Sequence, residues 1–433
     1  MRFFDSAMVS LTSLLIFYST FFQFAQSVPL EIDRPQALHS RQNAATTNYK
    51  ATAINAINAM GKTFSTTTKQ WANLTGWQSA NVYNDIIDND RYSGDRTWQA
   101  QYGEALRAIA TTPSLQNGKA QSEDEYTDDR LWWCLAMIRA YDTYDRGNLK
   151  NPELVAAIDS YNTISKQSLL SSEEAGTTPS GRTVQIQAGC DVDGAVYWNS
   201  KADSGITSIS TSLFAEVSAW LYDITRNSVY HDNAVRSLAW IQRNALDTRT
   251  GIVVKDSMRP ASCQQIAGGL TYNTGMSLDS FVIRTNVPPG IYLGVLSSLY
   301  LTTGNSSYLA AANLTATTTA LGHWTSKKTT PKLVVDEDMG KTTAGDWVQW
   351  RDALFRNLVD YYVLVKGKNT NSMVQSQIQA FWQANFDQIQ KFAKPNPALD
   401  LYSAEWFGAI KAGSDWGTGS VVSVLNGAMV ILN

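Results

Sequence analysis

The sequence has little of what several classes of protein require. Its formal net charge is −3 over 433 residues and it has no run of like charges, so we expect neither a nucleic-acid partner nor a charged interaction tail. It has only three cysteines and three histidines, and their spacing is not that of zinc ligands. After residue 24 no apolar run is long enough to span a membrane. The remaining composition, 44% hydrophobic and 17% charged, is that of a globular protein with a large core.

The first 27 residues have the pattern of a secretory signal peptide. Met1-Arg2 precedes an apolar segment from Leu11 to Phe24, and Ala25-Gln26-Ser27 supplies small residues for cleavage before Val28. A signal anchor is the alternative, but Ser and Thr interrupt the segment and it is short for a bilayer span. We expect residues 28–47 to be a leader, with a weak processing signal ending at Arg41, and residues 48–433 to form a single domain.

Three glycosylation sequons agree with secretion. Each has the pattern Asn-x-Ser/Thr that is modified in surface segments of secreted proteins. Their acceptor asparagines are Asn73, Asn305 and Asn313. We therefore expect a secreted glycoprotein. Separately, we expect a monomer.

Helical spacing of apolar residues dominates the chain. Strand-like alternation is sparse, with Ile252-Val253-Val254 and Leu333-Val334-Val335 as short candidates. The fold class that this pattern predicts is all-α. The segments that favour a helix are 48–69, a stretch through Trp98 to Ile109, 131–141, 151–170, 209–225, 231–245, 290–302, 307–322, 346–366 and 373–393.

A repeat indicates how these helices are arranged. Tyr144, Tyr222 and Tyr300 are spaced 78 residues apart, and each is followed twelve residues later by an alanine. We interpret each step as two helical hairpins of about 39 residues. Roughly 380 residues then allow about six hairpins, which can close into a toroid with an inner and an outer ring of helices.

Two consecutive aspartates, Asp128 and Asp129, begin a helix that is apolar on all sides from Leu131 to Tyr141. Such a helix belongs inside a protein. The simplest interpretation is capping, because Asp accepts hydrogen bonds from the free N–H groups of the first turn. The alternative is catalysis, since most glycosidases use two carboxyl groups, one protonated and one ionised. Neighbouring aspartates reach the short separation of a retaining enzyme more easily than the longer one of an inverting enzyme.

Loops rich in Gly, Asp and aromatic residues separate the predicted hairpins. They run over 189–199, 268–275 and 336–346, and aromatic rings beside Asn and Asp suit a sugar, although large aromatics also fill cores. The acidic residues Asp191, Asp193 and Asp336-Glu337-Asp338 are turn residues or, alternatively, calcium ligands. Cys190 and Cys263 lie in such loops and are the plausible disulfide pair, whereas Cys134 in the buried helix is expected to be a free thiol. The tryptophans expected near these loops are Trp77, Trp132, Trp133, Trp198, Trp347 and Trp350.

Several of these motifs together resemble glycoside hydrolase family 76, the endo-α-1,6-mannanases of bacteria and fungi with the fungal cell-wall mannosidase-like proteins. The most specific block is Thr127-Asp128-Asp129-Arg130-Leu131-Trp132-Trp133. Thr211, where the family commonly has Asn, and an apparent insertion at 276–289 are departures from its pattern. The supporting motifs, in family order over residues 48–433, are 75–81, 194–198, Thr271-Tyr272-Asn273, 299–309 and Phe355-Arg356.

The resemblance implies an (α/α) six-hairpin toroid and a retaining mechanism without metal or cofactor. It implies that Asp128 is the nucleophile and Asp129 the general acid/base, acting on α-1,6-mannan or a mannoprotein glycan outside the cell or in its wall. A cell-wall transglycosidase on the same aspartates and a non-catalytic glycan-binding protein are the alternatives. The implied substrate-binding residues are Asn81, Trp132, Tyr197, Trp198, Tyr272 and Asn273.

Overall fold

The computed structural model describes residues 44–74, 76–112, 126–171, 185–199, 204–253, 255–267, 289–320, 347–394, 401–407 and 413–432. All of these residues belong to one compact unit, Ala37–Asn433. Several predictions fall outside the described residues and stay predictions: the signal peptide and leader, Tyr272, Asn273, the acidic run 336–338 and the strand candidate 333–335.

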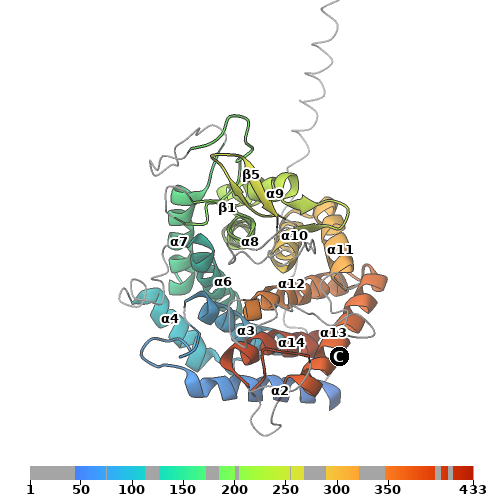
Figure 1. Cartoon of the computed structure of the whole chain (residues 1–433). Coiled ribbons are helices and arrows are strands. Elements are labelled where there is room, and N and C mark those ends of the chain that lie inside the picture. Colours follow the sequence, from blue (N-terminus) through green and yellow to red (C-terminus); the bar gives the residue numbers. More distant parts are fainter. Residues whose placement is uncertain are drawn as a thin grey trace, which may run out of the picture. The chain divides into compact units, whose positions relative to one another are not determined.

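Six of the described helices form a closed inner ring (Figure 1). Each packs against the next one along the chain, and the last packs against the first. This confirms the predicted (α/α) toroid. The inner helices are α3 (Trp77–Ser93), α6 (Thr127–Tyr144), α8 (Ser208–Thr225), α10 (Pro289–Thr303), α12 (Trp347–Gly367) and α14 (Asp415–Ile431).

Six further helices pack on the outside of this ring. One outer helix returns the chain between each two inner helices, so all inner helices run in the same direction and their N-termini share one end of the ring. A 3₁₀ turn, η1 (Gly61–Thr63), and a π-helical turn, η2 (Gln99–Gly103), join some of these elements. The outer helices are α2 (Ala44–Met60), α4 (Glu104–Thr111), α7 (Pro152–Ser168), α9 (Ser228–Asn244), α11 (Ser306–Ala320) and α13 (Ser372–Phe392).

The structure corrects our interpretation of the repeat. Tyr144 ends α6, and Tyr222 and Tyr300 lie near the ends of α8 and α10. One 78-residue step therefore contains one hairpin, not two, and the remaining length lies in the connections. The prediction of six hairpins is still correct, because other steps around the ring are shorter. The helical patterns also miss α3, which is rich in Asn and Asp, and α14, which has glycines at positions 417 and 419 in its first turns.

Short strands lie at the end of the ring where the inner helices begin. β1 (Ile206–Thr207) directly precedes α8, and it pairs with β4 (Lys255–Arg259), which pairs in turn with β5 (Gln264–Ala267). All these pairings are antiparallel. β2 (Leu246–Asp247) and β3 (Ile252–Val253) form a separate ribbon, so the predicted strand at Ile252 is confirmed.

Two inner helices are buried for different reasons. α6 is buried from Leu131 to Tyr141, as its apolar sequence predicts. α3 is buried from Trp77 to Asp90 although it is rich in Asn and Asp. Buried polar groups are costly unless they are paired, so the ring must supply partners for α3.

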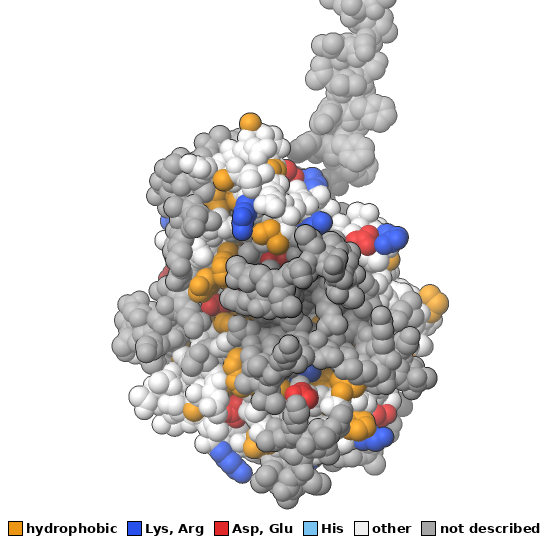
Figure 2. All heavy atoms as spheres, viewed as in Figure 1, with side chains coloured by type: hydrophobic (Ala, Val, Ile, Leu, Met, Phe, Trp, Pro, Cys, Tyr) orange, Lys and Arg blue, Asp and Glu red, His pale blue; other side chains and the backbone are white. Residues whose placement is uncertain are grey.

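The charged side chains of the described residues are spread over the face shown in Figure 2. On the face shown in Figure 2, the described Lys and Arg side chains are scattered and form no continuous basic patch. Within the same residues, no helix combines the length and the apolarity needed to cross a bilayer.

Candidate active site

The first turn of α6 is held by a neighbouring loop. Tyr126, the N-cap residue, is extended and forms an isolated antiparallel bridge with Asn199. The N–H of Thr127 donates to the carbonyl oxygen of Trp198 over 2.7 Å. The rings of Tyr126 and Trp198 lie with their centroids 4.6 Å apart. The predicted aromatic loop therefore lies directly beside the aspartate pair.

This loop is fixed at several main-chain atoms. The Trp198 N–H donates to Gly205 over 2.9 Å, and the Tyr197 N–H donates to Ser168 over 3.0 Å. Thr211 holds the loop from α8, because its Oγ1 accepts from the Val196 N–H over 3.1 Å and donates to the Thr207 carbonyl over 2.8 Å. Thr211, one of the departures from the family pattern, thus positions the residues before Trp198.

Gly194 lets the same loop approach α9 closely. Its φ is +88°, and a Cβ at this position would lie 2.3 Å from the carbonyl oxygen of Arg236. Any other residue would force the loop outward. The Ala195 N–H closes a turn to the Val192 carbonyl over 3.0 Å, so Asp193-Gly194 forms a turn, as one of the two interpretations of the acidic loop predicts.

The carboxyl group of Asp128 lies where burial and hydrogen bonding act in opposite directions. Burial raises the pKa of Asp128 to about 7, and the charge of Asp256 contributes to this increase. Hydrogen bonds from the N–H groups of Asp128 and Asp129 and from the Trp198 indole lower the same pKa. Among the described groups, none donates to the buried Oδ1 of Asp128. The carboxyl group can therefore exchange a proton near neutral pH, and α6 supplies N–H groups that stabilise its ionised form.

Asp129 is the next residue in the first turn and is half-buried, like Asp128. The N-cap residue, Tyr126, makes no side-chain hydrogen bond to this helix end, and the Asp128 carboxyl group accepts from the first N–H groups instead. Capping and catalysis are therefore compatible here. The N–H groups that donate to the Asp128 carboxylate find their partner at the helix end, and they also stabilise the anion that a nucleophile requires.

Two of the predicted substrate residues are buried in the inner helices. Asn81 is 1% exposed, and its Oδ1 accepts from Arg356 Nη2 over 3.0 Å. Trp132 is 3% exposed, stacks on Trp77 at 6.3 Å and has the Arg356 guanidinium 5.8 Å from its ring. Arg356 thus joins Asn81 on α3 to Trp132 on α6.

The other predicted aromatic residues divide between core and surface. Trp77, Trp132 and Trp133, expected near the loops, are buried helix residues, which corrects that placement. Tyr197 is also fully buried, whereas Trp198 is half-buried and retains an exposed part. That Asn81, Trp132, Tyr197 and Trp198 contact sugar stays a prediction, and the side chains of Trp347 and Trp350 lie outside the described residues.

Ion pairs along the ring interior supply partners for part of the polar face of α3. Arg356 Nη1 donates to Asp85 over 3.1 Å. Arg139, fully buried on α6, donates to Asp88 over 2.8 Å and to Asp360 on α12 over 2.9 Å. Asn81, Asp85 and Asp88 follow helical spacing on one face, a signal that sequence analysis could have used.

Glu216 on α8 is a further buried acid in this interior. It is fully buried, and no described group donates to either of its carboxylate oxygens. Burial raises its pKa to about 7. The ring packs closely there, since a Cβ on Gly294 would lie 2.8 Å from Glu216 Oε1.

The acidic loop after Gly189 is paired with arginines. Asp191 accepts from Arg243 over 2.7 Å and from Asn244 over 2.9 Å, and Asp193 accepts from Arg236 over 2.8 Å. These contacts use the oxygens that a calcium ion would need. Within the described residues, no group of three His, Cys, Asp or Glu side chains has the arrangement of a metal site.

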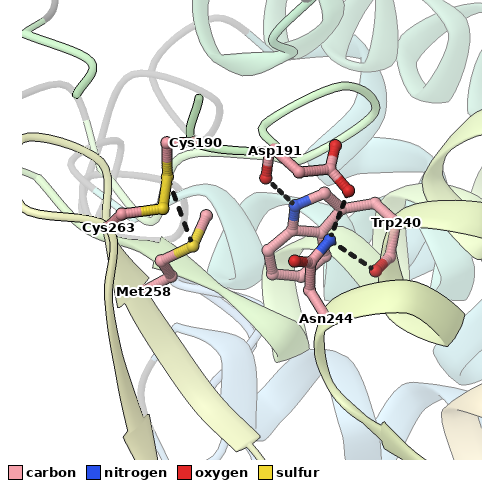
Figure 3. The surroundings of a disulfide bond; sticks show 6 residues. All are labelled: Cys190, Asp191, Trp240, Asn244, Met258 and Cys263. Atoms are coloured by element: carbon pink, nitrogen blue, oxygen red, sulfur yellow. Dashed lines mark hydrogen bonds between the residues drawn. A yellow bond between two sulfur atoms is a disulfide. The ribbon is translucent and has the colours of Figure 1, made fainter. Parts of the chain in front are cut away.

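A disulfide joins this loop to the β4–β5 hairpin (Figure 3). Its cysteines are Cys190 and Cys263, and the sulfur of Met258 lies 3.7 Å from Cys190. The Gln187 N–H also donates to the Pro260 carbonyl over 2.9 Å. Cys134 is a buried free thiol. The loop that carries Trp198 and the hairpin that carries Asp256 are therefore covalently linked.

The three sequons differ in exposure. Asn73 and Asn305 are exposed, and Asn73 Nδ2 donates to Asp415 at the start of α14 over 3.0 Å. Asn313 is half-buried and its Oδ1 accepts from the Tyr361 hydroxyl. Thr315, the third residue of that sequon, is fully buried. Glycosylation of all three remains a prediction.

An (α/α)₆ ring with two adjacent carboxyl groups at the N-terminus of an inner helix, bordered by an aromatic loop, suits the two-carboxylate chemistry of a glycoside hydrolase. The chain belongs to Glycosyl hydrolase family 76, whose family model matches residues 39–429. This agrees with the resemblance of the Asp128-Asp129 block. A search of the curated proteins finds no match.

Solved structures share the fold at low sequence identity. An inactive variant of the α-1,6-mannanase GH76A of Salegentibacter sp. HEL1_6, bound to α-1,6-mannotriose, is 16% identical, with a TM-score of 0.68 over 89% of this chain and 100% of that one. Dfg5 of Chaetomium thermophilum, in complex with glucosamine, is 14% identical, with a TM-score of 0.62 over 90% of each chain. The GH76 α-mannanase of Bacteroides thetaiotaomicron has a TM-score of 0.57 at 13% identity, over 90% of this chain and 98% of that one.

Proposed function

We propose that this glycoside hydrolase cleaves internal α-1,6-mannosidic linkages of mannan with retention of anomeric configuration. The single observation that carries the proposal is the position of Asp128 and Asp129 at the start of an inner helix in a family 76 fold. The similar Salegentibacter mannanase is inactive when two consecutive aspartates are replaced by asparagine, and it then holds α-1,6-mannotriose.

In the first step, the ionised carboxylate of Asp128 attacks the anomeric carbon while the bond to the leaving oxygen breaks. Asp129 donates its proton to that oxygen, so that the shortened chain leaves as an alcohol. In the second step, Asp129 accepts a proton from water, and the resulting hydroxide displaces Asp128 from the sugar. Both aspartates then return to their original protonation states.

The surroundings of Asp128 suit the nucleophile role. Burial raises the pKa of Asp128, and the Trp198 indole and two main-chain N–H groups oppose this increase by stabilising the anion. The pair that it forms with Asp129 divides the work between an ionised and a protonated group, because each negative charge disfavours the other.

The test is product analysis on linear α-1,6-mannan. The wild-type protein should release oligosaccharides of several lengths, and Asp128→Asn and Asp129→Asn should each reduce the rate by at least about a thousandfold. Asp232→Asn, an exposed carboxylate on α9, is the matched control and should keep wild-type activity. Products that persist in both active-site variants would overturn the assignment. Saturable mannan binding without products would favour the non-catalytic alternative.

A transglycosidase would use the same first step and then pass the sugar to an acceptor hydroxyl instead of water. Adding a mannobiose acceptor to the assay separates the two activities, since extended products require transfer.

We further propose that the protein is a secreted, monomeric glycoprotein of the extracellular space or cell wall, on the basis of the N-terminal pattern and the sequons. Fractionation of producing cells, with glycosidase treatment of the purified protein, tests this.

A further inference from the structure

We propose that Asn305 is the main N-glycosylation site of the folded protein and that Asn313 carries no glycan, with Asn73 between them in occupancy. The inference rests on the proposed secretion of the chain, and it ranks three sequons that the sequence does not distinguish. Asn305 lies in the turn between α10 and α11, where all three residues of its sequon are exposed.

The Asn305 sequon has a defined local geometry. The Asn305 Oδ1 accepts from the Ser307 N–H over 3.0 Å and from the Ser307 hydroxyl over 2.9 Å. The Asn305 N–H donates to Thr303 Oγ1 over 3.2 Å. This is an Asx turn, in which the hydroxyl that defines the sequon bonds to the amide oxygen. Within the described residues nothing accepts from Asn305 Nδ2, the nitrogen that would receive the sugar.

The turn can form before the rest of the ring folds. Its contacts join residues between Thr303 and Tyr308, whose N–H donates to the Asn305 carbonyl over 3.1 Å. N-linked glycans are added as the chain enters the secretory pathway. A turn made by neighbouring residues is therefore available when the sugar is transferred, and the folded protein leaves it exposed.

Asn313 is in the opposite situation, because it lies within α11 and contacts an inner helix. Its Oδ1 accepts from the Tyr361 hydroxyl on α12. Thr315, the third residue of this sequon, is fully buried, and its Oγ1 donates to the Gly251 carbonyl over 2.7 Å. A glycan on the Asn313 amide would occupy space beside Tyr361. A chain carrying it could not complete this contact, so we expect none in the folded protein.

Asn73 lies at the other end of the ring, beside the start of α14. It is exposed, but its Nδ2 donates to Asp415 Oδ2 over 3.0 Å, and Asp415 is only 4% exposed. A glycan would be attached to this same nitrogen and would replace one of its two hydrogens. The end of the ring with Asn73 also carries Asp128, whereas Asn305 lies where the inner helices end. A glycan on Asn305 therefore leaves the substrate end open.

The preceding hairpin supplies a matched control. In the turn between α8 and α9, the Asn227 N–H donates to Thr225 Oγ1 over 3.3 Å, and the Asn227 Oδ1 accepts from the Val229 N–H over 3.1 Å. Val229 is 56% exposed and occupies the position that Ser307 has in the next hairpin. This turn thus has the same contacts but lacks the hydroxyl of a sequon. Val229→Thr supplies that hydroxyl with little change in shape.

Glycopeptide analysis of the full chain, exported from a eukaryotic cell, tests the ranking. Releasing the glycans with peptide-N-glycosidase F in H₂¹⁸O converts each occupied asparagine into ¹⁸O-labelled aspartate, which mass spectrometry quantifies. We expect nearly full labelling of Asn305, less of Asn73 and almost none of Asn313. An unlabelled Asn305, or labelling of Asn313 equal to that of Asn305, would overturn the inference.

Two variants test whether the turn determines occupancy. Ser307→Val should abolish the label at Asn305, and Val229→Thr should create a new label at Asn227. An unlabelled Asn227 in Val229→Thr would overturn the role of the turn. A parallel sample with an unrelated signal peptide separates the inference from the proposed secretion, because failure of the chain's own N-terminal segment would then refute only the localisation.

Activity tests the position of the glycan. The rate of mannan cleavage by Ser307→Val should stay within about twofold of that of the glycosylated wild type, since the glycan lies away from Asp128. A larger change would contradict this position. A wild-type protein that does not cleave mannan would refute the proposed reaction, whereas the labelling result would still decide the glycan site.

Discussion

The N–H of Thr127 and the carbonyl oxygen of Trp198 form a 2.7 Å hydrogen bond that ties the start of α6 to the aromatic loop. This bond places the Trp198 indole where it donates to the carboxyl group of Asp128 on the following residue. The loop is also linked to β1 by the bridge between Tyr197 and Ile206, and to the β4–β5 hairpin by the disulfide between Cys190 and Cys263. The chemistry proposed for Asp128 therefore depends on how this loop is held.

Trp198→Phe should make Asp128 harder to ionise. The substitution keeps a ring beside Tyr126 but removes the N–H that stabilises the carboxylate. The acid limb of kcat/KM should move to higher pH, and activity at pH 6 should fall several-fold. Trp240→Phe is the matched control, because its indole donates to the Asp191 carbonyl instead. An unchanged acid limb in Trp198→Phe would contradict the assigned hydrogen bond.

Arg356→Met should strongly destabilise the protein. It leaves the buried Asp85 without its partner and removes the donor to Asn81. Breaking a buried pair of this kind typically costs about 3–5 kcal/mol in the free energy of unfolding. Urea denaturation checks this, with the 88% exposed Arg249 replaced by alanine as the control. A loss below that of the control would show that the pair contributes little.

The protein should be more stable at pH 5 than at pH 7.5. Burial raises the pKa of Asp128 and Glu216 to about 7, above the value of about 4 in an unfolded chain. Between these values the folded protein binds more protons than the unfolded chain, so stability falls as the pH rises. Asp360 has the opposite sign, because Arg91 and Arg139 lower its pKa, and its contribution is lost only in more acidic solution.

Glu216→Gln isolates one part of this effect. It should raise the melting temperature at pH 7.5 and reduce the difference between pH 5 and pH 7.5, because a buried charge can no longer form. Asp232→Asn should leave that difference unchanged. A wild-type protein that is more stable at pH 7.5 than at pH 5 would contradict the assignment of neutral buried acids.

Removing the disulfide should lower both stability and activity. Cys190 and Cys263 close a loop of 73 residues, and chain-entropy arguments assign such a cross-link about 4 kcal/mol. The double variant Cys190→Ser/Cys263→Ser should melt at lower temperature and no longer respond to reductant. Cys134→Ala, which removes the buried free thiol, should still respond. Equal melting temperatures for the double variant and the wild type would contradict this role.

The sequence predicts the parts of the fold that depend on local pattern. The apolar run of α6 is sufficient to indicate a buried helix, and the two aspartates before it mark the candidate site. The aromatic residues around Trp198 point to the neighbouring loop. The length of one repeat is not predictable in this way, since the 78-residue step includes connections whose length has no relation to helix periodicity.

Residues brought in by long-range pairing escape sequence analysis. Lys255-Asp256-Ser257 has no strand-like character, and its position follows from pairing between β1 and β4 about fifty residues apart in the chain. α3 shows the same limit, because its acids become buried only when Arg139 and Arg356 arrive from α6 and α12. The polar spacing of Asn81, Asp85 and Asp88 indicates a face but not its partners.

Azide rescue tests the assignment of the two aspartates most directly. With an activated aryl α-1,6-mannobioside, azide should restore turnover of Asp128→Gly by replacing the nucleophile, giving the β-glycosyl azide. It should restore Asp129→Gly by replacing water in the second step, giving the α-glycosyl azide. The anomeric configuration is read from the NMR coupling constants of the products. The β-azide from Asp128→Gly and the α-azide from Asp129→Gly are the predicted result; the reverse pairing, or no azide product from either variant, would contradict the account.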